Sequence, residues 1–322
     1  MIDMRRDSRI IEMVKIPNHE GELDDDQIID LYLAVHGHSP QTASNYRRAF
    51  LLFRGFVTNK RLAQVNWKDI EAFKMGLAKG YCSYSGQPLA PASISALIAP
   101  LKSLYKWGSD PNIGLFPQNP ATAVKIPSVP VTSTKRYLTQ EEVLILLNRL
   151  KMGGERNYLI VLSLVMLGLR VSELVSIRWG NFQPDPLNTS VWLTVEKGKG
   201  GKQRGVKVPG RLWSLLDKYK KSLQEKGMAA EADYVFPISS RQVERIIQAA
   251  SNQCFPSKKP TPHWLRHTNA TLALLSGATL QQVQNTLGHS HINTTQRYLH
   301  TVEQIEKAAP DYVEDCLLLH DE

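Results

Sequence analysis

Four short segments of this sequence place cationic side chains at points where regular structure is expected to break. The segments are Gly168-Leu169-Arg170 at a helix end, the tip Gly198-Lys199-Gly-Gly-Lys-Gln-Arg204, the run His263-Trp-Leu-Arg266-His267, and Leu287-Gly288-His289. His263 and Arg266 are three residues apart on an expected helix, so they share one face. Two donors on one face can converge on a single anion, and an arginine can bind two phosphate oxygens at once. The segments therefore predict a site for a phosphate-like anion.

The charge of the chain also favours a polyanionic partner. Its 322 residues include 39 Lys and Arg against 30 Asp and Glu, which gives a net charge of +9. Residues 31–136 carry thirteen basic and three acidic side chains, and residues 137–301 carry twenty-one and eleven. The two ends, 1–30 and 302–322, are acidic. A body with this excess of cations is typical of a nucleic-acid-binding protein.

The cysteines and the hydropathy exclude several classes of protein. Cys82, Cys254 and Cys316 are odd in number and far apart, so neither a disulfide framework nor a zinc site with paired cysteines is available. The N-terminus lacks the apolar core of a signal peptide, and no stretch approaches the roughly 20 apolar residues of a membrane span. We expect a soluble protein of the reducing cytoplasm, with no membrane partner.

The first part of the chain predicts an all-helical domain. An acidic lead-in, residues 1–22, precedes a domain expected over 23–120. Start and stop signals predict helices from Asp24 to Leu33, from Ser39-Pro40 to about Val57, from Asn66 to Gly80, and from Pro91 to Gly108. Pro100 should kink the last of these helices.

A linker rich in Pro, Ser and Thr, residues 121–136, separates this domain from a second one over 137–301. Two strands, Val191–Val195 and Gly205–Val208, should form a hairpin with a basic, glycine-rich tip. Helices are expected from the Thr139 capping box onward, through an apolar run ending at Gly168, and at about 210–226, 241–254, 263–276, 279–287 and 294–300. The predicted fold class is mainly α with one small antiparallel sheet.

Taken together, the motifs resemble those of the tyrosine recombinases, the phage integrase superfamily. The residues that carry the resemblance are Gly168-Leu-Arg170-Val-Ser-Glu173-Leu, Gly198-Lys199-Gly-Gly-Lys-Gln-Arg204, Thr261-Pro-His263-Trp-Leu-Arg266-His267, Leu287-Gly288-His289-Ser and Thr294-Thr-Gln-Arg-Tyr298. Their order and spacing match over residues 137–300, and the helical unit before them is similar to the family's N-terminal DNA-clamping domain. The resemblance implies a Xer-like, two-domain architecture with an all-α DNA-binding domain and an α+β catalytic domain.

The resemblance also implies a catalytic role for several residues. Tyr298 would attack the scissile phosphate and form a 3′-phosphotyrosine link with a free 5′-hydroxyl. Arg170 and Arg266 would hold the non-bridging oxygens, and His289 would be a further phosphate donor. Lys199 would protonate the leaving 5′ oxygen.

Two further residues would support this chemistry. His263 resembles the residue that accepts the tyrosine proton, and Glu173 would orient the basic residues. Arginines would stabilise the negative charge of the transition state, and each transesterification conserves the phosphodiester bond energy. No metal, ATP or other cofactor is therefore expected.

Outside the catalytic set, basic side chains should contact DNA phosphates. The residues predicted for this role are Arg47, Arg48 and Arg54 in the second helix, and Lys202 and Arg204 at the hairpin tip. A solvated cationic face is the alternative for the three helical arginines. Lys202 is the alternative to Lys199 as the general acid.

Other residues of the same types compete with the catalytic assignments. Tyr219 and Tyr312 are the rivals of Tyr298 as nucleophile, but only Tyr298 follows His289 by nine residues on a short polar helix. The remaining histidines near the motifs are expected to be structural or to face solvent; they are His267, His291 and His300.

The function implied by the resemblance is site-specific DNA recombination for integration, excision or resolution. The expected partners are a double-stranded recombination site, three further copies of the chain in a homotetramer on two duplexes, and accessory proteins, in the cytoplasm with the nucleoid. The tail, residues 302–322, is expected to contact a neighbouring protomer, and packing onto its own domain is the alternative. Two alternatives are relaxation of DNA by a type IB topoisomerase and a non-catalytic accessory DNA-binding protein.

Overall fold

Two compact units make up the chain, and the boundary between them along the sequence falls between Pro130 and Val131. This boundary lies within the segment 121–136 that was predicted as a linker. The computed structural model describes residues 23–37, 39–58, 60–83, 85–128, 136–196, 203–225, 227–255, 257–289, 292, 295, 296, 298, 313 and 314.

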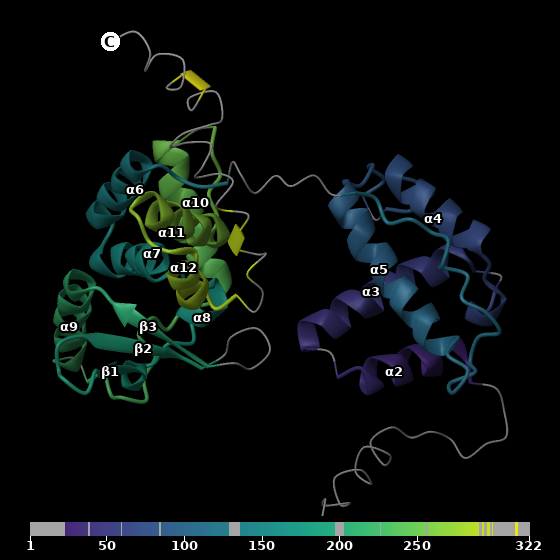
Figure 1. Ribbon diagram of the computed structural model, residues 1–322, viewed down its shortest axis with the longest axis horizontal. Helices are drawn as coiled ribbons and strands as arrows, with labels where there is room; N and C mark the ends of the chain where they lie inside the picture. The colour runs from purple at the N-terminus through teal and green to yellow at the C-terminus, as the bar shows by residue number, and fades with distance from the viewer. Residues whose placement is uncertain are drawn as a thin grey trace, which may run out of the picture. The chain divides into compact units, whose positions relative to one another are not determined.

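The first unit is a bundle of helices, as predicted (Figure 1). Its elements are α2 (Asp25–Val35), α3 (Pro40–Phe56), the 3-10 turn η1 (Leu62–Gln64), α4 (Trp67–Lys79) and α5 (Pro91–Gly108). The side chains of Asp24, Ser39 and Asn66 each accept a hydrogen bond from a backbone N–H of the helix that follows, which confirms three predicted starts. Helix α5 runs through Pro100, which is buried.

An aromatic core holds these helices together. Phe50, Phe53, Phe73 and Tyr105 are each at most 1% exposed. The rings of Phe53 and Phe73 meet edge to face with centroids 5.2 Å apart, an arrangement that aromatic pairs favour. Because α3 buries one stripe of its surface in this core, its basic side chains stay on the outside of the unit.

The second unit combines helices with a three-stranded antiparallel sheet, which confirms the predicted fold class. Its helices are α6 (Gln140–Met152), α7 (Glu155–Leu167), α8 (Val171–Leu174), α9 (Gly210–Gln224), α10 (Ser240–Cys254), α11 (Pro262–Leu275) and α12 (Leu280–Leu287). Its strands are β1 (Phe182–Pro184), which follows the 3-10 turn η3 (Trp179–Asn181), β2 (Val191–Val195) and β3 (Arg204–Val208).

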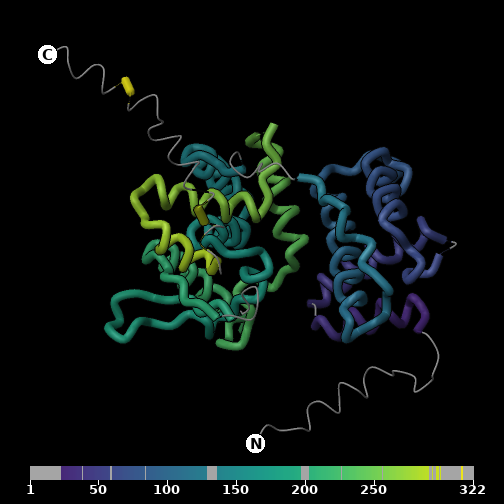
Figure 2. The backbone as a smooth tube through the Cα atoms, turned by 45° about the vertical axis from the view of Figure 1, so that its right-hand side comes forward, coloured from purple at the N-terminus to yellow at the C-terminus, as the bar shows by residue number. Residues whose placement is uncertain are grey.

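Helix α7 is the central element of this unit, and from Leu159 to its end every residue except Met166 is buried. It contacts α6, α9 and α11, and Figure 2 shows the yellow-green α11 beside the teal α7. The helix ends at Gly168 in a left-handed conformation with φ +59°. A Cβ there would lie 2.6 Å from Asn269 Oδ1 and 2.7 Å from Leu287 Cδ2, so both the backbone and the space require glycine. This turn positions Arg170 next to α11 and α12.

The strands alternate between buried and outward side chains. Leu193 and Val195 on β2 and Val206 and Val208 on β3 are buried, and β2 pairs with β3 up to the partners Val195 and Arg204. Strand β1 and helix α8 were not predicted, because three or four residues are too few to show a periodicity. Most of the helix predicted at 294–300 lies outside the described residues.

No helix in the part of the chain that the structure describes is long and apolar enough to cross a membrane.

Candidate active site

Helix α8 brings an arginine and a carboxylate together at the turn after α7. Arg170 precedes the helix, and its backbone N–H donates to Glu173 Oε2 at 2.8 Å. Its guanidinium NH1 donates to Glu173 Oε1 at 2.8 Å. The Arg170 side chain stays 29% exposed while that of Glu173 is fully buried. Glu173 therefore anchors Arg170 through both its backbone and its guanidinium, and part of the Arg170 side chain stays accessible.

Arg266 on α11 is a buried cation, only 2% exposed. Its NH1 donates to the Gly168 carbonyl at 2.6 Å, and its NH2 donates to the Leu287 carbonyl at 2.5 Å. Burial and then the charge of Arg170 lower the pKa of Arg266 to about 10, so it is still a cation at neutral pH. Two candidate phosphate-binding arginines thus lie together.

His263 and His267 are one helical turn apart on α11, with ring centroids 4.3 Å from each other. Partial burial, followed by the charges of Arg266 and Arg170, lowers the pKa of His263 below its usual 6.5. A neutral imidazole at pH 7 can accept a proton, as the predicted general base must.

His289 follows Gly288, the left-handed residue that ends α12. Its Nδ1 forms a hydrogen bond of 2.9 Å with the Thr295 hydroxyl. When that hydroxyl donates, the proton of the neutral ring lies on Nε2, which suits donation to a phosphate. Burial and then the charges of Arg266 and Arg170 lower the pKa of His289 to about 4.

Tyr298 lies in the middle of these residues and is only 8% exposed. Its ring is parallel to that of His289 with centroids 6.4 Å apart, and 5.2 Å from that of His267. A negative charge on Tyr298 would raise the pKa of Arg266, so that cation would in turn favour the phenolate. The ring packs in a small core made by α11 and α12: Ala270, Leu274, Val283 and Leu287.

Tyr219, the rival nucleophile that the structure describes, is not in this position. Tyr219 is buried in the main core of the unit, near the rings of Trp179 and Phe236. Tyr312 lies outside the described residues. Of the tyrosines that the structure describes in this unit, Tyr298 is the one that the site surrounds.

His267 was expected to be structural or to face solvent, and the structure places it between His263 and Tyr298. Among the described residues its Nδ1 is buried and has no hydrogen-bond partner. Burial and then His263 lower its pKa to about 4. The sequence held one signal, the four-residue spacing from His263 on a helix. His291 and His300 lie outside the described residues.

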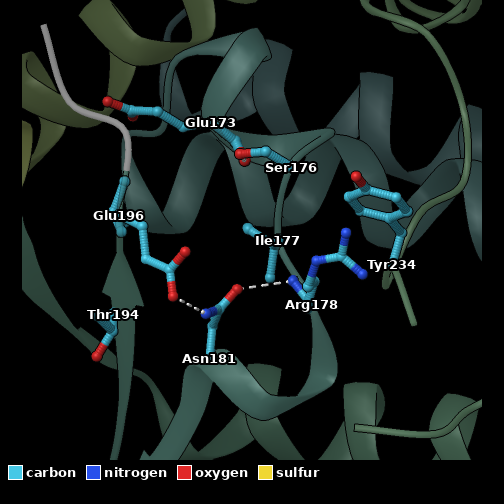
Figure 3. Close-up of a pocket in the computed structure, with 9 residues that line it drawn as sticks. Glu173, Ser176, Ile177, Arg178, Asn181, Thr194, Glu196 and Tyr234 are labelled. Carbon is cyan, nitrogen blue, oxygen red and sulfur yellow. Dashed lines mark hydrogen bonds between the residues drawn. The ribbon is translucent and has the colours of Figure 1, made fainter. Parts of the chain in front are cut away.

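The base of the lysine hairpin is held on both sides. Glu196, which follows the last paired residue of β2, accepts a hydrogen bond from Asn181 Nδ2 at 3.0 Å. Asn181 Oδ1 accepts from the backbone N–H of Arg178 at 2.8 Å (Figure 3). On the other side, β3 begins at Arg204 opposite Val195. The hairpin tip therefore starts from two fixed points.

The predicted general acid Lys199 and the predicted DNA-binding Lys202 lie outside the described residues. Arg204, predicted to contact DNA at the tip, has its side chain turned into the unit and only 11% exposed. It pairs with both oxygens of Glu173 and with the Thr286 carbonyl. The sequence predicted that Arg204 contacts DNA phosphates, and this inward orientation of its side chain was not foreseen.

The arginines of α3 are exposed or half-exposed, but two of them have acidic partners. Arg47 pairs with Asp30 at 2.5 Å, and Arg54 pairs with Asp25 at 3.5 Å and also with Asp26. The prediction that these arginines bind DNA assumed few acidic residues near them and did not include the aspartates of α2. Their contact with DNA remains a prediction.

Arg48, the third arginine of α3, lies at a groove of about 450 Å³ between α3 and α5. Polar side chains from the turn before α5 share this groove; they are Ser83 and Ser85. Its contact with DNA also remains a prediction.

Comparison with known proteins places this geometry in a family. A sequence model of the phage integrase family matches residues 136–304, which span the whole candidate site. A tyrosine recombinase of Thermosipho africanus is 30% identical over 286 residues, covering 87% of this chain and 96% of that protein. The tyrosine recombinase XerC of Myxococcus xanthus is 30% identical and covers 84% of this chain and 91% of its own.

Two solved structures share the fold. A lambda integrase dimer bound to a COC′ core site matches with a TM-score of 0.67 and 19% identity, over 94% of this chain and 87% of that one. The XerH recombinase in a pre-cleavage complex with its difH substrate matches with a TM-score of 0.66 and 19% identity, over 94% and 88%. The family profile, the relatives along nearly their whole length and the grouping of Arg170, Arg266, His289 and Tyr298 agree, and the chain accordingly belongs to the phage integrase family, as a site-specific recombinase of the tyrosine type.

Proposed function

We propose that this recombinase cuts and rejoins DNA through Tyr298, using the surrounding cations to bind the scissile phosphate. The observation that carries the proposal is the position of the Tyr298 ring against His289 and His267, close to the buried cation Arg266. A phenol has an ordinary pKa near 10, so it needs a base and a positive site to act as a nucleophile at neutral pH.

The proposed reaction consists of two successive transesterifications. The Tyr298 oxygen attacks phosphorus and gives its proton to His263, while the bond from phosphorus to the 5′ oxygen breaks. Lys199 gives a proton to that leaving oxygen, which becomes a 5′-hydroxyl. Attack by a 5′-hydroxyl on the phosphotyrosine then reverses the sequence and releases the enzyme.

Stabilisation of the extra negative charge falls to Arg170, Arg266 and His289. Arg170 keeps an accessible guanidinium and Arg266 is held rigidly by two carbonyls, so both cations are in place before DNA binds. Such preorganised donors stabilise a transition state without reorganisation at the moment of reaction. We expect EDTA to leave cleavage largely intact, because guanidinium groups take the role that a metal ion would have.

The DNA partner and the assembly follow from the same proposal. Residues 23–120 would be an N-terminal domain that binds DNA with the arginines of α3, and residues 137–301 the catalytic domain. A homotetramer on two duplexes, aided by accessory proteins, would carry out the exchange in the cytoplasm with the nucleoid. The lambda integrase and XerH structures support DNA as the partner because they hold bound core-site and difH DNA.

Family membership favours recombination over the two alternatives, DNA relaxation by a topoisomerase and non-catalytic DNA binding. The discriminating experiment uses a nicked recombination-site DNA, from which a short 5′ fragment diffuses away after cleavage and prevents religation. Wild-type protein should become covalently linked to the DNA, and Tyr298→Phe should bind the same DNA without any covalent product. Labelling of the Phe variant would show that another residue is the nucleophile. Relaxation of plasmid DNA without strand exchange would favour the topoisomerase.

A further inference from the structure

Arg204 occupies an inward-facing position that its charge does not explain by itself. It has the same parity on β3 as the buried Val206 and Val208, so its side chain points from the sheet into the unit. A buried arginine is stable only when its donors are satisfied. Its partners therefore indicate what it does.

These partners belong to the two segments that carry candidate catalytic residues. NH1 donates to Glu173 Oε1 at 2.9 Å and NH2 donates to Oε2 at 2.8 Å, a two-pronged pair with the carboxylate that anchors Arg170. Nε donates to the Thr286 carbonyl at 2.9 Å, in the last turn of α12 before His289.

The close approach of this side chain also depends on Gly288. A Cβ on Gly288 would lie 2.7 Å from Arg204 Cδ and 3.0 Å from its Nε. The residue directly after that glycine is His289. The stem of Arg204 thus passes against the turn that presents His289, while its guanidinium reaches the carboxylate that holds Arg170.

We propose that Arg204 is a positioning residue that joins β3, α8 and the end of α12, and thereby fixes Arg170 and His289 in their phosphate-binding geometry. This inference rests on the proposed function of those two residues. Arg204 itself does not touch the DNA phosphate, because each of its three side-chain nitrogens, Nε included, already donates to Glu173 or to the Thr286 carbonyl. A carboxylate shared by two arginines holds each of them in one orientation, whereas Arg170 with Glu173 alone keeps more freedom.

The test compares four variants in single-turnover cleavage of the nicked DNA at saturating protein, with DNA affinity and thermal unfolding measured separately. They are Arg204→Met, Arg204→Lys, the double variant Glu173→Gln with Arg204→Met, and Lys207→Met. Lys207 is the matched control, an exposed cation on the same strand. The Lys207→Met variant should cleave at the wild-type rate.

Arg204→Met should keep its DNA affinity within about twofold and cleave about 100-fold more slowly, since a displacement of about 1 Å in a catalytic group has an effect of this size. Arg204→Lys keeps the charge but can make only one of the two parallel bonds, so its rate should be intermediate. The pH profile adds a separate readout. Hydrogen bonds from Arg204 and Arg170 lower the pKa of Glu173 to about 2 although burial opposes them, so the loss of Arg204 should move the acid limb of the profile to higher pH.

The double variant separates positioning from a role in stability alone. It removes both buried charges, so its unfolding temperature should recover relative to Arg204→Met, but its cleavage should stay slow because Arg170 has lost its anchor. Wild-type cleavage by the double variant, or a rate loss in Arg204→Met that matches a loss of DNA affinity, would overturn the inference. A failure of the proposed function would look different, because wild-type protein would then give no covalent product either, and the inference would fall with it.

Discussion

The ring of His267 lies 5.2 Å from the ring of Tyr298, and its buried Nδ1 has no hydrogen-bond partner among the described residues. We expect the ring to support Tyr298 by its shape and packing, and not through that nitrogen.

This relationship predicts a difference between two substitutions. His267→Phe keeps the ring and gives up no hydrogen bond at Nδ1, so covalent cleavage should stay within a few-fold of wild type. His267→Ala leaves a cavity beside Tyr298 and should slow cleavage by about tenfold or more. Trapping assays on nicked DNA measure both rates, and equal losses in the two variants would show that the ring shape is not what matters.

The histidines of the site predict how stability depends on pH. The pKa of His267 and that of His289 are about 4 in the folded protein, against 6.5 for an unperturbed histidine. Between these values the unfolded chain binds more protons than the folded one, so stability should fall as the pH is lowered from 6.5 toward 4.5. Below 4.5 the loss of the Glu173 pairs should add to the effect.

Thermal unfolding of wild type and His267→Phe across this window checks the prediction. The Phe variant cannot take up a proton at this position, so its unfolding temperature should fall less between pH 6.5 and 4.5. Parallel curves for the two proteins would contradict the assignment of a low pKa to His267.

The proposed general-acid role of Lys199 predicts a selective rescue. Lys199→Ala should slow cleavage severely, and a substrate with sulfur in place of the 5′ bridging oxygen should restore much of the rate, because a thiolate leaves without a proton. Arg170→Ala should gain no such rescue, since it removes charge stabilisation. Comparable rescue of both variants would remove the general-acid role from Lys199, and rescue of Lys202→Ala would transfer it to that residue.

The contact between Gly288 and Arg204 predicts a coupled effect on stability. Gly288→Ala should destabilise the protein, because the new Cβ meets the Arg204 stem and the backbone has φ +67°. In an Arg204→Ala background the collision disappears, and the remaining cost should fall to the roughly 1 kcal/mol of a left-handed alanine. Denaturant unfolding of the four proteins measures the coupling, and strictly additive effects would show that the two residues do not interact.

The acidic tail predicts a loss of assembly without a loss of DNA binding. Residues 302–322 carry seven acidic and one basic side chain, which disfavours a contact with DNA and favours a contact with protein. Deletion of residues 306–322 should leave binding to a single site intact and abolish tetramers and strand exchange. Native gels and recombination assays report these separately, and normal tetramers from the truncated protein would exclude the role.

Most of the helical fold could be predicted from the sequence because its signals are local. Caps such as Asp24 and Thr139 and the stop at Gly168 act within a few residues, and the structure has helices that begin or end there. Strand β1 escaped prediction because its formation depends on pairing with β2, which no local pattern reports.

The partners of the site residues were harder to predict than the residues themselves. Arg204 and Glu173 are 31 residues apart in the chain, and no local sequence pattern near either residue predicts that they pair. The parity of Arg204 with Val206 on β3 was the available signal, since it placed a charge on the buried face. The ion pairs of Arg47 and Arg54 were missed for the same reason, because their acidic partners lie on another helix.

The two carbonyls bound by Arg266 end two different helices, Gly168 after α7 and Leu287 at the end of α12. Carbonyls at a helix C-terminus lack partners within the helix, so this guanidinium closes both ends at once. Removal of Arg266 would therefore disturb the ends of both helices as well as remove a positive charge. A variant that tests the proposed chemistry while keeping the fold is therefore better made at Tyr298 than at Arg266.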